Sequence, residues 1–550
     1  MILSHHLSLL LCLPLAGALL VLCVPDRRGD AVRWLASSVA LAGFLLSTPF
    51  WFAYDPGNPD FQFVERARWI PWLGAQYVLG LDGISTLLVL LTTLMGCIAT
   101  LASWSSISGR VKEHYVTLLV LQTGMLGTFM ALDALLFFVF WEVALVAMYF
   151  LIAIWGSPAR TRSATRFLVS MLTGSVALLL GILALAFQSR AVRGAFSFDI
   201  TTLQALSVPF DVQWWIFLAF FIGFAIAVPL FPLHSWLPDA HSDAPTAGSI
   251  ILGAVMLKMG TYGFLRFSLP MLPEATRYFV PFVAALSMIG IVYGAFVALA
   301  QKDWKRLVAC SSVSHMGMVM LGMMVMSPVG LTGSLVQQID HGIAIGALFL
   351  LVGFIHDRRH IREIAAYGGL SRVMPAFAVV FLVMSLFSIG LPTPNGWVGE
   401  FLILKGAFTH SRGWAAAAGS GIVLGAAYMF SLYRRTMLGA VTNVENARLP
   451  DLRAREWLTV APLVALAGWM VMYPAPFVER VNLSALKIAA RVDASYAAEF
   501  AAACDTTVTD ELKAAAPGNQ FLAAAPCGPD GQPLAPGTVV PGVDPPGSGR

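Results

Sequence analysis

Long apolar stretches, separated by short polar segments, follow one another along almost the whole chain. A helix needs about 20 apolar residues to cross a bilayer. Fourteen stretches approach or exceed this length, at residues 6–24, 31–53, 78–104, 114–132, 134–156, 164–188, 214–240, 245–268, 275–300, 307–327, 329–355, 373–411, 414–433 and 457–475. The first is expected to stay as a helix and not to be a cleaved signal peptide, because no Lys or Arg precedes it. The pattern predicts an all-α polytopic membrane protein of about 14 transmembrane helices.

Two of these stretches are interrupted by prolines. Residues 214–240 are broken at 228–232, and residues 373–411 are broken at 390–396. Proline removes a helical hydrogen bond, and lipid tolerates the unpaired backbone groups only where they face protein or a water-filled path. Broken helices at matching places in two halves are typical of inverted-repeat transporters. We therefore predict two inverted five-helix repeats, helices 4–8 and 9–13, with breaks in helices 7 and 12.

These repeats divide the chain into five expected parts. They are helices 1–3 at 1–113, the first antiporter-like repeat at 114–268, the second at 269–434, helix 14 at 435–480, and an external C-terminal extension at 481–550. Within the extension, residues 484–503 predict a short surface helix. Residues 505–550 are rich in Pro, Gly and Ala, a composition typical of disorder.

The composition supports a membrane location. Hydrophobic residues make up 58% of the chain and charged residues 12%, against about 25% charged in an average soluble domain. The net charge of +4 gives no reason to expect a nucleic-acid partner. The expected surroundings are therefore the lipid bilayer.

The basic residues predict the orientation. Twenty Lys and Arg residues fall in the odd-numbered loops and seven in the even-numbered loops. Because cytoplasmic loops carry the excess of Lys and Arg, the odd loops are expected to face the cytoplasm. Both termini then lie outside, which is the periplasm for a multi-pass protein of the bacterial inner membrane.

The sequence offers no pattern for a cofactor or a metal. No two of the six cysteines have the spacing of a zinc or iron–sulfur site; they are Cys12, Cys23, Cys97, Cys310, Cys504 and Cys527. No P-loop or dinucleotide-binding glycine pattern follows a predicted strand. We expect no cofactor and no metal in this chain.

Ionisable residues inside the spans are the informative ones, because each costs about 2.5–3.5 kcal/mol at a helix centre and is a functional candidate by default. The main set comprises Glu142, Lys258, His315, His341 and Glu400. Imidazole can relay protons because one nitrogen accepts while the other donates. Amine, imidazole and carboxyl groups at similar depth on several helices predict a proton path along the membrane plane.

Each member of this set has a structural alternative. His315 could be a helix–helix hydrogen-bond partner, and Lys258 and Glu142 could belong to structural ion pairs. Asp82, near the outer end of the third span, is expected to cap a helix or to pack. The prediction of a relay therefore depends on the whole set.

A second group of polar residues lies at the cytoplasmic end of the seventh span. It comprises His234, Asp239 and His241. These residues could form a proton entrance, or they could belong to a solvated turn. We retain them as candidate entrance residues.

Several short motifs resemble a known family. They lie at residues 138–142, 148–152, 234–241, 244–249, 257–263, 311–317 and 397–401. Together they resemble the antiporter-like subunit M family of the proton-pumping NADH–quinone oxidoreductase, respiratory complex I, over about residues 1–480. A Glu after the break in helix 12, here Glu400, resembles subunit M, whereas the L-type and N-type subunits of the complex typically have Lys.

The resemblance implies a fourteen-helix membrane-arm subunit without a redox centre, in contact with the L-type and N-type subunits. Quinone reduction elsewhere in the complex would drive proton translocation here. By position, the family's proton-relay residues match Glu142, Lys258, His315, His341 and Glu400. Lys258 would be the central switch and Glu400 the terminal residue.

The chain departs from the family pattern at several positions. Ala227 replaces the usual Lys partner of Glu142, and Ala147 replaces a Pro. Asp340 and Lys405 add charges where neutral residues are more common, so both are candidate modifiers. Two other functions stay open: a subunit of a multi-component sodium/proton antiporter, and a structural membrane-arm paralogue that does not pump.

Overall fold

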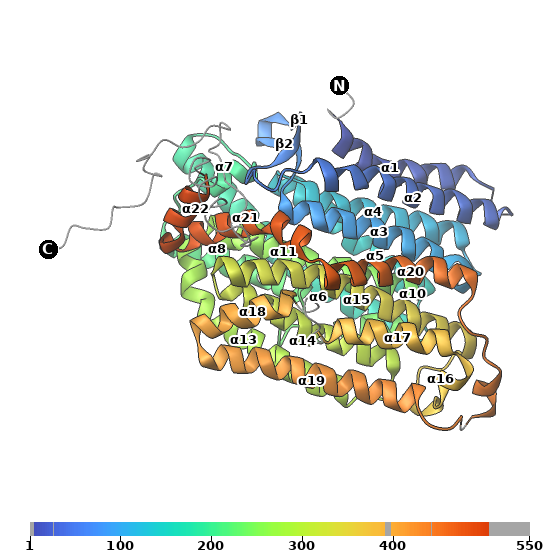
Figure 1. Cartoon of the computed structure of the whole chain (residues 1–550). Helices are drawn as coiled ribbons and strands as arrows, with labels where there is room; N and C mark the ends of the chain where they lie inside the picture. The colour runs from blue at the N-terminus through green and yellow to red at the C-terminus, as the bar shows by residue number, and fades with distance from the viewer. Residues whose placement is uncertain (1–4, 26, 391–397, 442, 505–550) are drawn as a thin grey trace.

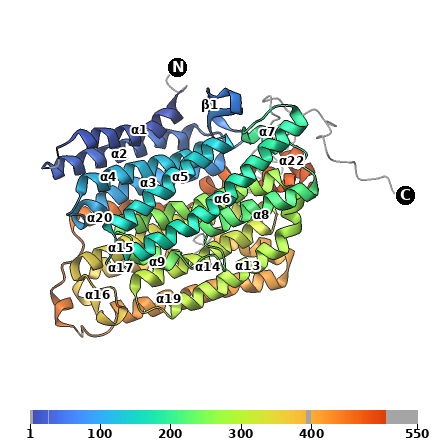
Figure 2. The ribbon, with the colours of Figure 1, turned by 180° about the vertical axis from the view of Figure 1, so that it is seen from behind.

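The computed structural model describes residues 5–25, 27–390, 398–441 and 443–504, and these residues are almost entirely helical. The long helices lie side by side in one bundle (Figure 1). The same arrangement is seen from behind in Figure 2.

Twelve α-helices form the first half of the chain. They are α1 (His6–Cys23), α2 (Gly29–Ala53), α3 (Gly83–Ser106), α4 (Val111–Met130), α5 (Ala134–Trp155), α6 (Arg160–Arg193), α7 (Ile200–Gln204), α8 (Phe210–Ala227), α9 (Leu237–Asp243), α10 (Thr246–Ile251), α11 (Leu257–Gly263) and α12 (Leu269–Met271). The last three join through two π-helical turns, η2 (Leu252–Met256) and η3 (Phe264–Ser268), into one span, Thr246–Met271.

The second half adds ten α-helices. They are α13 (Pro273–Leu299), α14 (Trp304–Met324), α15 (Pro328–Arg359), α16 (Leu370–Val373), α17 (Pro375–Ser388), α18 (Val398–His410), α19 (Arg412–Met437), α20 (Ala454–Met472), α21 (Ala475–Val492) and α22 (Ala497–Cys504). Short 3-10 turns lie at Pro71–Leu73, Ile364–Ala366, Val444–Arg448 and Ala494–Tyr496.

The predicted all-α membrane architecture is confirmed. By length and composition, eleven described helices could cross a membrane, or twelve if α20 and α21, bent by 73°, form one span. Each of the fourteen predicted stretches contains helix. Three predicted stretches correspond to none of the eleven spanning helices: the stretch of α4, the stretch of α20, and the stretch that contains α17 and α18.

The start of the third predicted span is wrong. Residues 75–81 form strand β2 (Ala75–Leu81), which pairs antiparallel with β1 (Gln62–Ile70) in a two-stranded sheet, with Gln62 opposite Leu81 and Ile70 opposite Ala75. Helix α3 begins only after Asp82, whose carboxylate accepts a hydrogen bond from the backbone N–H of Ser85 at 2.9 Å. The apolar run of β2 resembles a helix start, but its backbone pairs with β1.

Both predicted helix breaks fall between helices. Helix α8 ends at Ala227, and α9 begins only at Leu237. Helix α17 ends at Ser388 and α18 begins at Val398. Most of the second proline-containing break, 391–397, lies outside the described residues, as do residues 505–550.

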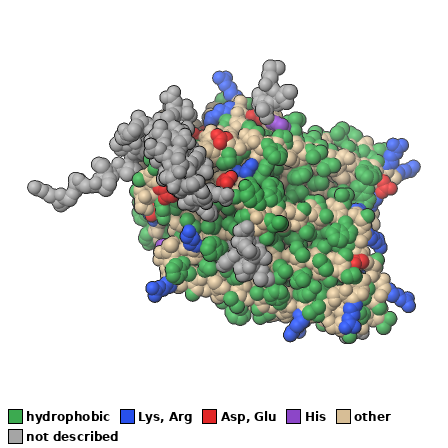
Figure 3. All heavy atoms as spheres, viewed as in Figure 1, with side chains coloured by type: hydrophobic (Ala, Val, Ile, Leu, Met, Phe, Trp, Pro, Cys, Tyr) green, Lys and Arg blue, Asp and Glu red, His purple; other side chains and the backbone are tan. Residues whose placement is uncertain are grey.

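Burial separates central helices from peripheral ones. The span formed by α10, α11 and α12 is fully buried, as is α14. By contrast, only 39% of the residues in the 18-residue apolar stretch of each of α1, α2, α6 and α19 are buried. Figure 3 shows a face covered largely by hydrophobic side chains, with most Lys and Arg toward its edges. Polar residues on the central helices are therefore shielded from lipid.

Helix α21 crosses residue 480, where we expected the membrane part to end. It packs against α3 and α15, so closely that a Cβ on Gly83 would lie 1.8 Å from the carbonyl oxygen of Arg480. The guanidinium of Arg480 lies 3.7 Å from the ring centre of Trp51. The expected surface helix at 484–503 is thus the end of α21, which is largely buried, followed by α22.

Candidate functional site: a buried Lys–His–His–Glu axis

Lys258 lies on the fully buried α11, between the two π-helical turns. Its side chain has 0% exposed surface. The ammonium group donates a hydrogen bond to the carbonyl oxygen of Gly253 at 2.8 Å. π-Helical turns occur frequently at functional sites, and here they flank the one lysine of this helix.

The second contact of Lys258 joins it to another helix. Its Nζ lies 2.7 Å from Nδ1 of His341 on α15. At this distance the two nitrogens share one hydrogen atom, so a proton can move between amine and imidazole without any large movement. Nε2 of His341 is buried and has no hydrogen-bond partner in the described part of the chain.

His315 on α14 continues the axis. Its ring centre lies 5.5 Å from that of His341. Its Nδ1 lies 3.6 Å from Oε1 of Glu400 on α18, and its Nε2 lies 3.1 Å from the hydroxyl of Tyr428 on α19. Four helices therefore bring amine, two imidazoles and carboxyl into one continuous series.

Glu400 closes this series. It is 3% exposed, and its Oε1 accepts a hydrogen bond from Nε2 of Gln337 at 3.0 Å. Its Oε2 has no hydrogen-bond partner among the described residues. A Cβ on Gly390, whose φ is +58°, would lie 2.1 Å from that oxygen, so only glycine leaves room for the carboxyl group.

Sequence reasoning missed three polar supports of the axis. These are Gln337, Tyr428 and the pair of Thr261 with Gln338, in which the Thr261 hydroxyl donates to Oε1 of Gln338 at 2.5 Å. Helical spacing could have found two of them, because Thr261 lies three residues after Lys258 and Gln337 lies four before His341. Tyr428 gives no such signal.

Glu142 does not join the axis in the described residues. It lines a groove of about 410 Å³ between α4 and α5, together with Val116, Val120, Val146 and Phe150. Its Oε1 is buried without a hydrogen-bond partner in the described ranges.

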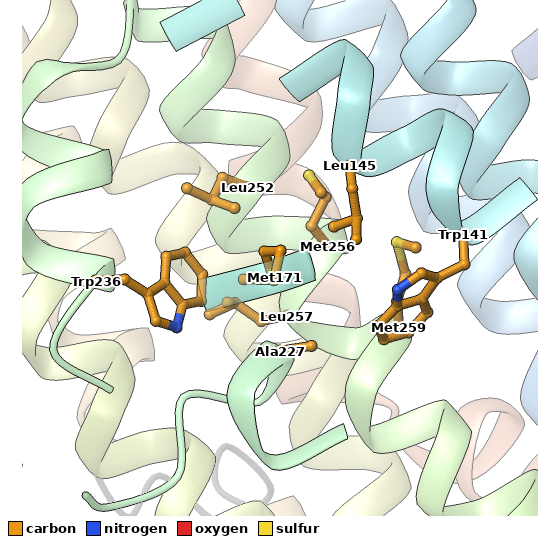
Figure 4. Close-up of a pocket in the computed structure, with 9 residues that line it drawn as sticks. All are labelled: Trp141, Leu145, Met171, Ala227, Trp236, Leu252, Met256, Leu257 and Met259. Carbon is orange, nitrogen blue, oxygen red and sulfur yellow. The ribbon is translucent and has the colours of Figure 1, made fainter. Parts of the chain in front are cut away.

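Ala227 lines a separate small cavity with Trp141, the residue before Glu142, and with Trp236 (Figure 4). Its methyl group carries no charge into this space. The side chain at the position of the family's lysine therefore offers no cation near Glu142.

The three candidate entrance residues lie in different surroundings. Asp239 is ion-paired with Arg166 and, at 3.0 Å, with Arg306. The His234 ring packs edge-to-face against Tyr293, with centres 5.3 Å apart. These two contacts fit structural roles.

His241 differs from both because it is fully buried. Its ring stacks on Phe349 with centres 4.5 Å apart, and neither ring nitrogen has a hydrogen-bond partner among the described residues. A Cβ on Gly253 would lie 3.3 Å from its Cε1. His241 therefore touches the turn whose carbonyl group accepts the hydrogen bond from Lys258.

The remaining candidate residues also differ from one another in burial and in partners. Asp340 is partly buried on α15 beside His341, whereas Lys405 is exposed on α18. Asp82, expected to cap or pack, caps α3 and also forms a buried ion pair with Arg266 at 2.8 Å. Among the described residues, no group of three or more His, Cys, Asp or Glu could hold a metal ion.

A many-helix bundle with two broken helices and a buried axis of ionisable side chains defines a membrane-embedded, antiporter-like subunit. The chain belongs to the NADH:quinone oxidoreductase/Mrp antiporter transmembrane family, whose model matches residues 131–425.

Curated relatives make this membership more specific. NADH-quinone oxidoreductase subunit M of Rhodobacter capsulatus is 42% identical over 489 residues, which cover 86% of this chain and 94% of that protein. NADH-ubiquinone oxidoreductase chain 4 of Marchantia polymorpha is 40% identical over 480 residues, covering 87% and 96%. The resemblance to the subunit M family is confirmed.

Solved structures agree on the fold. A chain of respiratory complex I from Thermus thermophilus with bound NADH matches with a TM-score of 0.79 at 31% identity, covering 88% of this chain and all of that one. The Mrp complex from Dietzia sp. DQ12-45-1b matches with a TM-score of 0.74 at 24% identity, covering 88% and 52%. The second match is a likeness in fold.

Proposed function

We propose that this chain is the proton-translocating membrane-arm subunit M of an NADH–quinone oxidoreductase. Quinone reduction in other subunits drives proton transfer through this one, which carries no cofactor, metal or redox centre of its own. Its neighbours are the L-type and N-type antiporter-like subunits. The observation that supports this function is the contact of Lys258 with His341, continued through His315 to Glu400.

The proton moves along this axis by short transfers. The Lys258 ammonium gives its proton to Nδ1 of His341 across 2.7 Å, which leaves a neutral amine and an imidazolium. Nε2 of His341 then releases a proton to Nδ1 of His315 across the gap between the two rings, while Nε2 of His315 stays hydrogen-bonded to Tyr428. One bridging water, or a rotation of either ring, closes that gap.

The last transfer runs from His315 to Glu400. Nδ1 of His315 and Oε1 of Glu400 are 3.6 Å apart, slightly more than a hydrogen bond. A small approach completes the contact. Gln337 orients Glu400 by its hydrogen bond to Oε1, and Tyr428 orients His315 by its hydrogen bond to Nε2. Neither of these two supporting residues takes up the proton.

Protons reach Lys258 from the cytoplasmic side past His241. Its unpartnered ring nitrogens lie next to the Gly253 turn, and an imidazole can accept on one nitrogen while it donates on the other. His234 and Asp239 then belong to the rim of this entrance.

The same order of elements occurs twice and supports the two repeats at 114–268 and 269–434. Helices α4, α5, α6, broken α8 and α10 are followed by α13, α14, α15, broken α17 and α19. The surplus of Lys and Arg in the odd loops supports placing both termini in the periplasm of a bacterial inner membrane. In Figure 1 the start of α1 and the region of α22 lie toward the same end of the bundle.

Substitution of Glu400 in the assembled complex tests this function. Glu400→Gln keeps the volume and the hydrogen bond to Gln337 but cannot bind the proton. We expect coupled quinone reduction and pumping to fall together. Lys405→Gln is the matched control, because Lys405 lies on the same helix and is exposed. Normal pumping by an assembled Glu400→Gln complex would exclude this route.

A further inference from the structure

Three successive carbonyl groups at the end of α9, those of residues 242–244, are bonded by three different parts of the chain. Their donors are, in order, the guanidinium of Arg362, the backbone N–H of Ser157 at 2.9 Å and Nζ of Lys305 at 2.5 Å. Arg362 follows α15, Ser157 follows α5, and Lys305 lies in the first turn of α14. The last carbonyl groups of a helix have no partner within it, so these bonds determine where the end of α9 lies.

Lys305 is the side chain that joins α9 to the axis. It is 8% exposed, and it lies on the helix that carries His315. Helices α9 and α14 lie side by side (Figure 2). The backbone N–H of Trp304 also donates to the carbonyl group of Arg362 at 2.9 Å, so two of the three donors belong to one connected unit at the start of α14.

The segment that these donors hold carries His241. This residue lies three positions before Ala244, which is less than one helical turn. Its ring stacks on Phe349 with centres 4.5 Å apart, and its Cε1 would lie 3.3 Å from a Cβ on Gly253. Because α9 has seven residues, about two turns, a shift of its end also moves this ring.

The ion pairs of α9 hold it less firmly than Lys305 does. Asp239 pairs with Arg166 and Arg306, and these three side chains are between 24% and 44% exposed. Ion pairs with such exposure are screened by solvent and contribute little. A hydrogen bond from a buried ammonium group is charge-assisted and belongs to the stronger ones. Loss of Lys305 should therefore displace the end of α9.

We infer that Lys305 is a positioning residue of the proton entrance. Its ammonium group holds the carbonyl group of Ala244 and thereby keeps the imidazole of His241 against the Gly253 turn. That turn accepts the hydrogen bond of Lys258. Lys305 itself does not pass the proton on but acts through His241. This inference rests on the proposed function, in which protons enter past His241.

Two substitutions at position 305 separate positioning from proton transfer. Lys305→Met removes the donor at similar side-chain volume, whereas Lys305→Arg keeps a donor that stays protonated in proteins. We expect Lys305→Met to lower proton pumping by the whole complex in sealed vesicles by as much as about 10²-fold, the loss that a displacement of about 1 Å can cause. Lys305→Arg should retain most of the pumping. Lys302→Met is the matched control, because Lys302 is three residues away and exposed.

Hydrogen–deuterium exchange at C2 of the His241 imidazole, followed by mass spectrometry of the assembled complex, reports the placement of the ring. This exchange should be several-fold faster in Lys305→Met than in the unmodified complex, and unchanged in Lys305→Arg and Lys302→Met. His114 is the internal reference, because its buried ring, 2.9 Å from the hydroxyl of Ser103, belongs to α4. A general loosening of the bundle would accelerate exchange at His114 as well.

Three results would overturn the inference. They are unchanged exchange at His241 in Lys305→Met, equal acceleration at His114 and His241, and an equal loss of pumping in Lys305→Met and Lys305→Arg. The last result would make Lys305 a proton carrier itself. If Lys305→Met does not assemble, Lys305→Gln takes its place, because its donor is shorter by one bond, and the same difference from Lys305→Arg is expected.

Failure of the inference differs from failure of the proposed function. If His241→Gln depresses pumping and Lys305→Met does not, the positioning role is refuted and the entrance stands. If an assembled His241→Gln complex pumps normally, the entrance past His241 fails, and the role of Lys305 in it fails too.

Discussion

Replacement of Lys258 by Met removes the proposed central proton carrier and changes the side-chain volume little. Lys258 Nζ is the group within hydrogen-bond distance of His341 Nδ1, so the transfer to His341 loses its donor. A positioned proton-transfer group contributes about 10²–10⁴-fold to a rate. We therefore expect coupled quinone reduction to fall by about 10²-fold or more, with pumping lost in parallel.

Assembly of the Lys258→Met complex should survive. Lys258 is fully buried, and an insertion cost of about 2.5–3.5 kcal/mol for a charged residue disappears with the thioether. Lys258→Ala would remove packing together with the proton site, because shortening a large buried side chain to Ala costs about 2–5 kcal/mol of stability through the cavity it leaves. Met therefore separates loss of the proton site from loss of packing.

The assay uses the complex reconstituted in sealed vesicles, with quinone reduction followed optically and internal pH followed with a dye. An uncoupler distinguishes blocked proton transfer from general damage, because electron transfer limited only by back-pressure would recover when the uncoupler is added. Near-normal pumping by an assembled Lys258→Met complex would refute the role of Lys258 and with it the axis.

Three further predictions follow from the same contacts. Gly390→Ala puts a Cβ 2.1 Å from Glu400 Oε2 and forces a residue with a side chain into a φ of +58°, so pumping should fall although Glu400 is intact; an unchanged rate would show that the carboxyl group moves freely. Asp82→Asn should lower the free energy of unfolding by about 3–5 kcal/mol because it leaves the charge of the buried Arg266 without its ion-pair partner, and Arg266→Met in the same chain should recover most of this in thermal unfolding of the purified complex. Glu142→Gln should reduce pumping less than Glu400→Gln, because Glu142 has no contact with the axis among the described residues; an equal loss in both would place Glu142 on the route.

Local hydropathy was sufficient to predict most of the membrane spans. Crossing a bilayer requires a run of apolar residues whatever the neighbouring helices are, so α5, α13 and α14 can be read from the chain alone. The same holds for the break after Ala227, since proline disrupts a helix through its own backbone. The individual charged residues could also be singled out, because each is costly inside an apolar run.

The hairpin β1–β2 and the burial of α21 could not be predicted in this way. The residues of β2 are apolar enough for a span, and only the pairing of their backbone with Gln62–Ile70 makes them a strand. α21 combines apolar and charged residues like a surface helix, yet its apolar side is covered by α3 and α15. In both cases the partner lies elsewhere in the sequence.

Which charged residues meet was decided by the tertiary structure. Lys258 and His341 are 83 residues apart, and their 2.7 Å contact depends on how α11 and α15 are rotated and packed. Hydropathy gives the depth of a residue in the membrane but not the direction in which its side chain points. Glu142 lies within an apolar span as the axis residues do, yet it lines a groove between α4 and α5. Helix rotation therefore separates it from the axis that brings Lys258, His341 and Glu400 together.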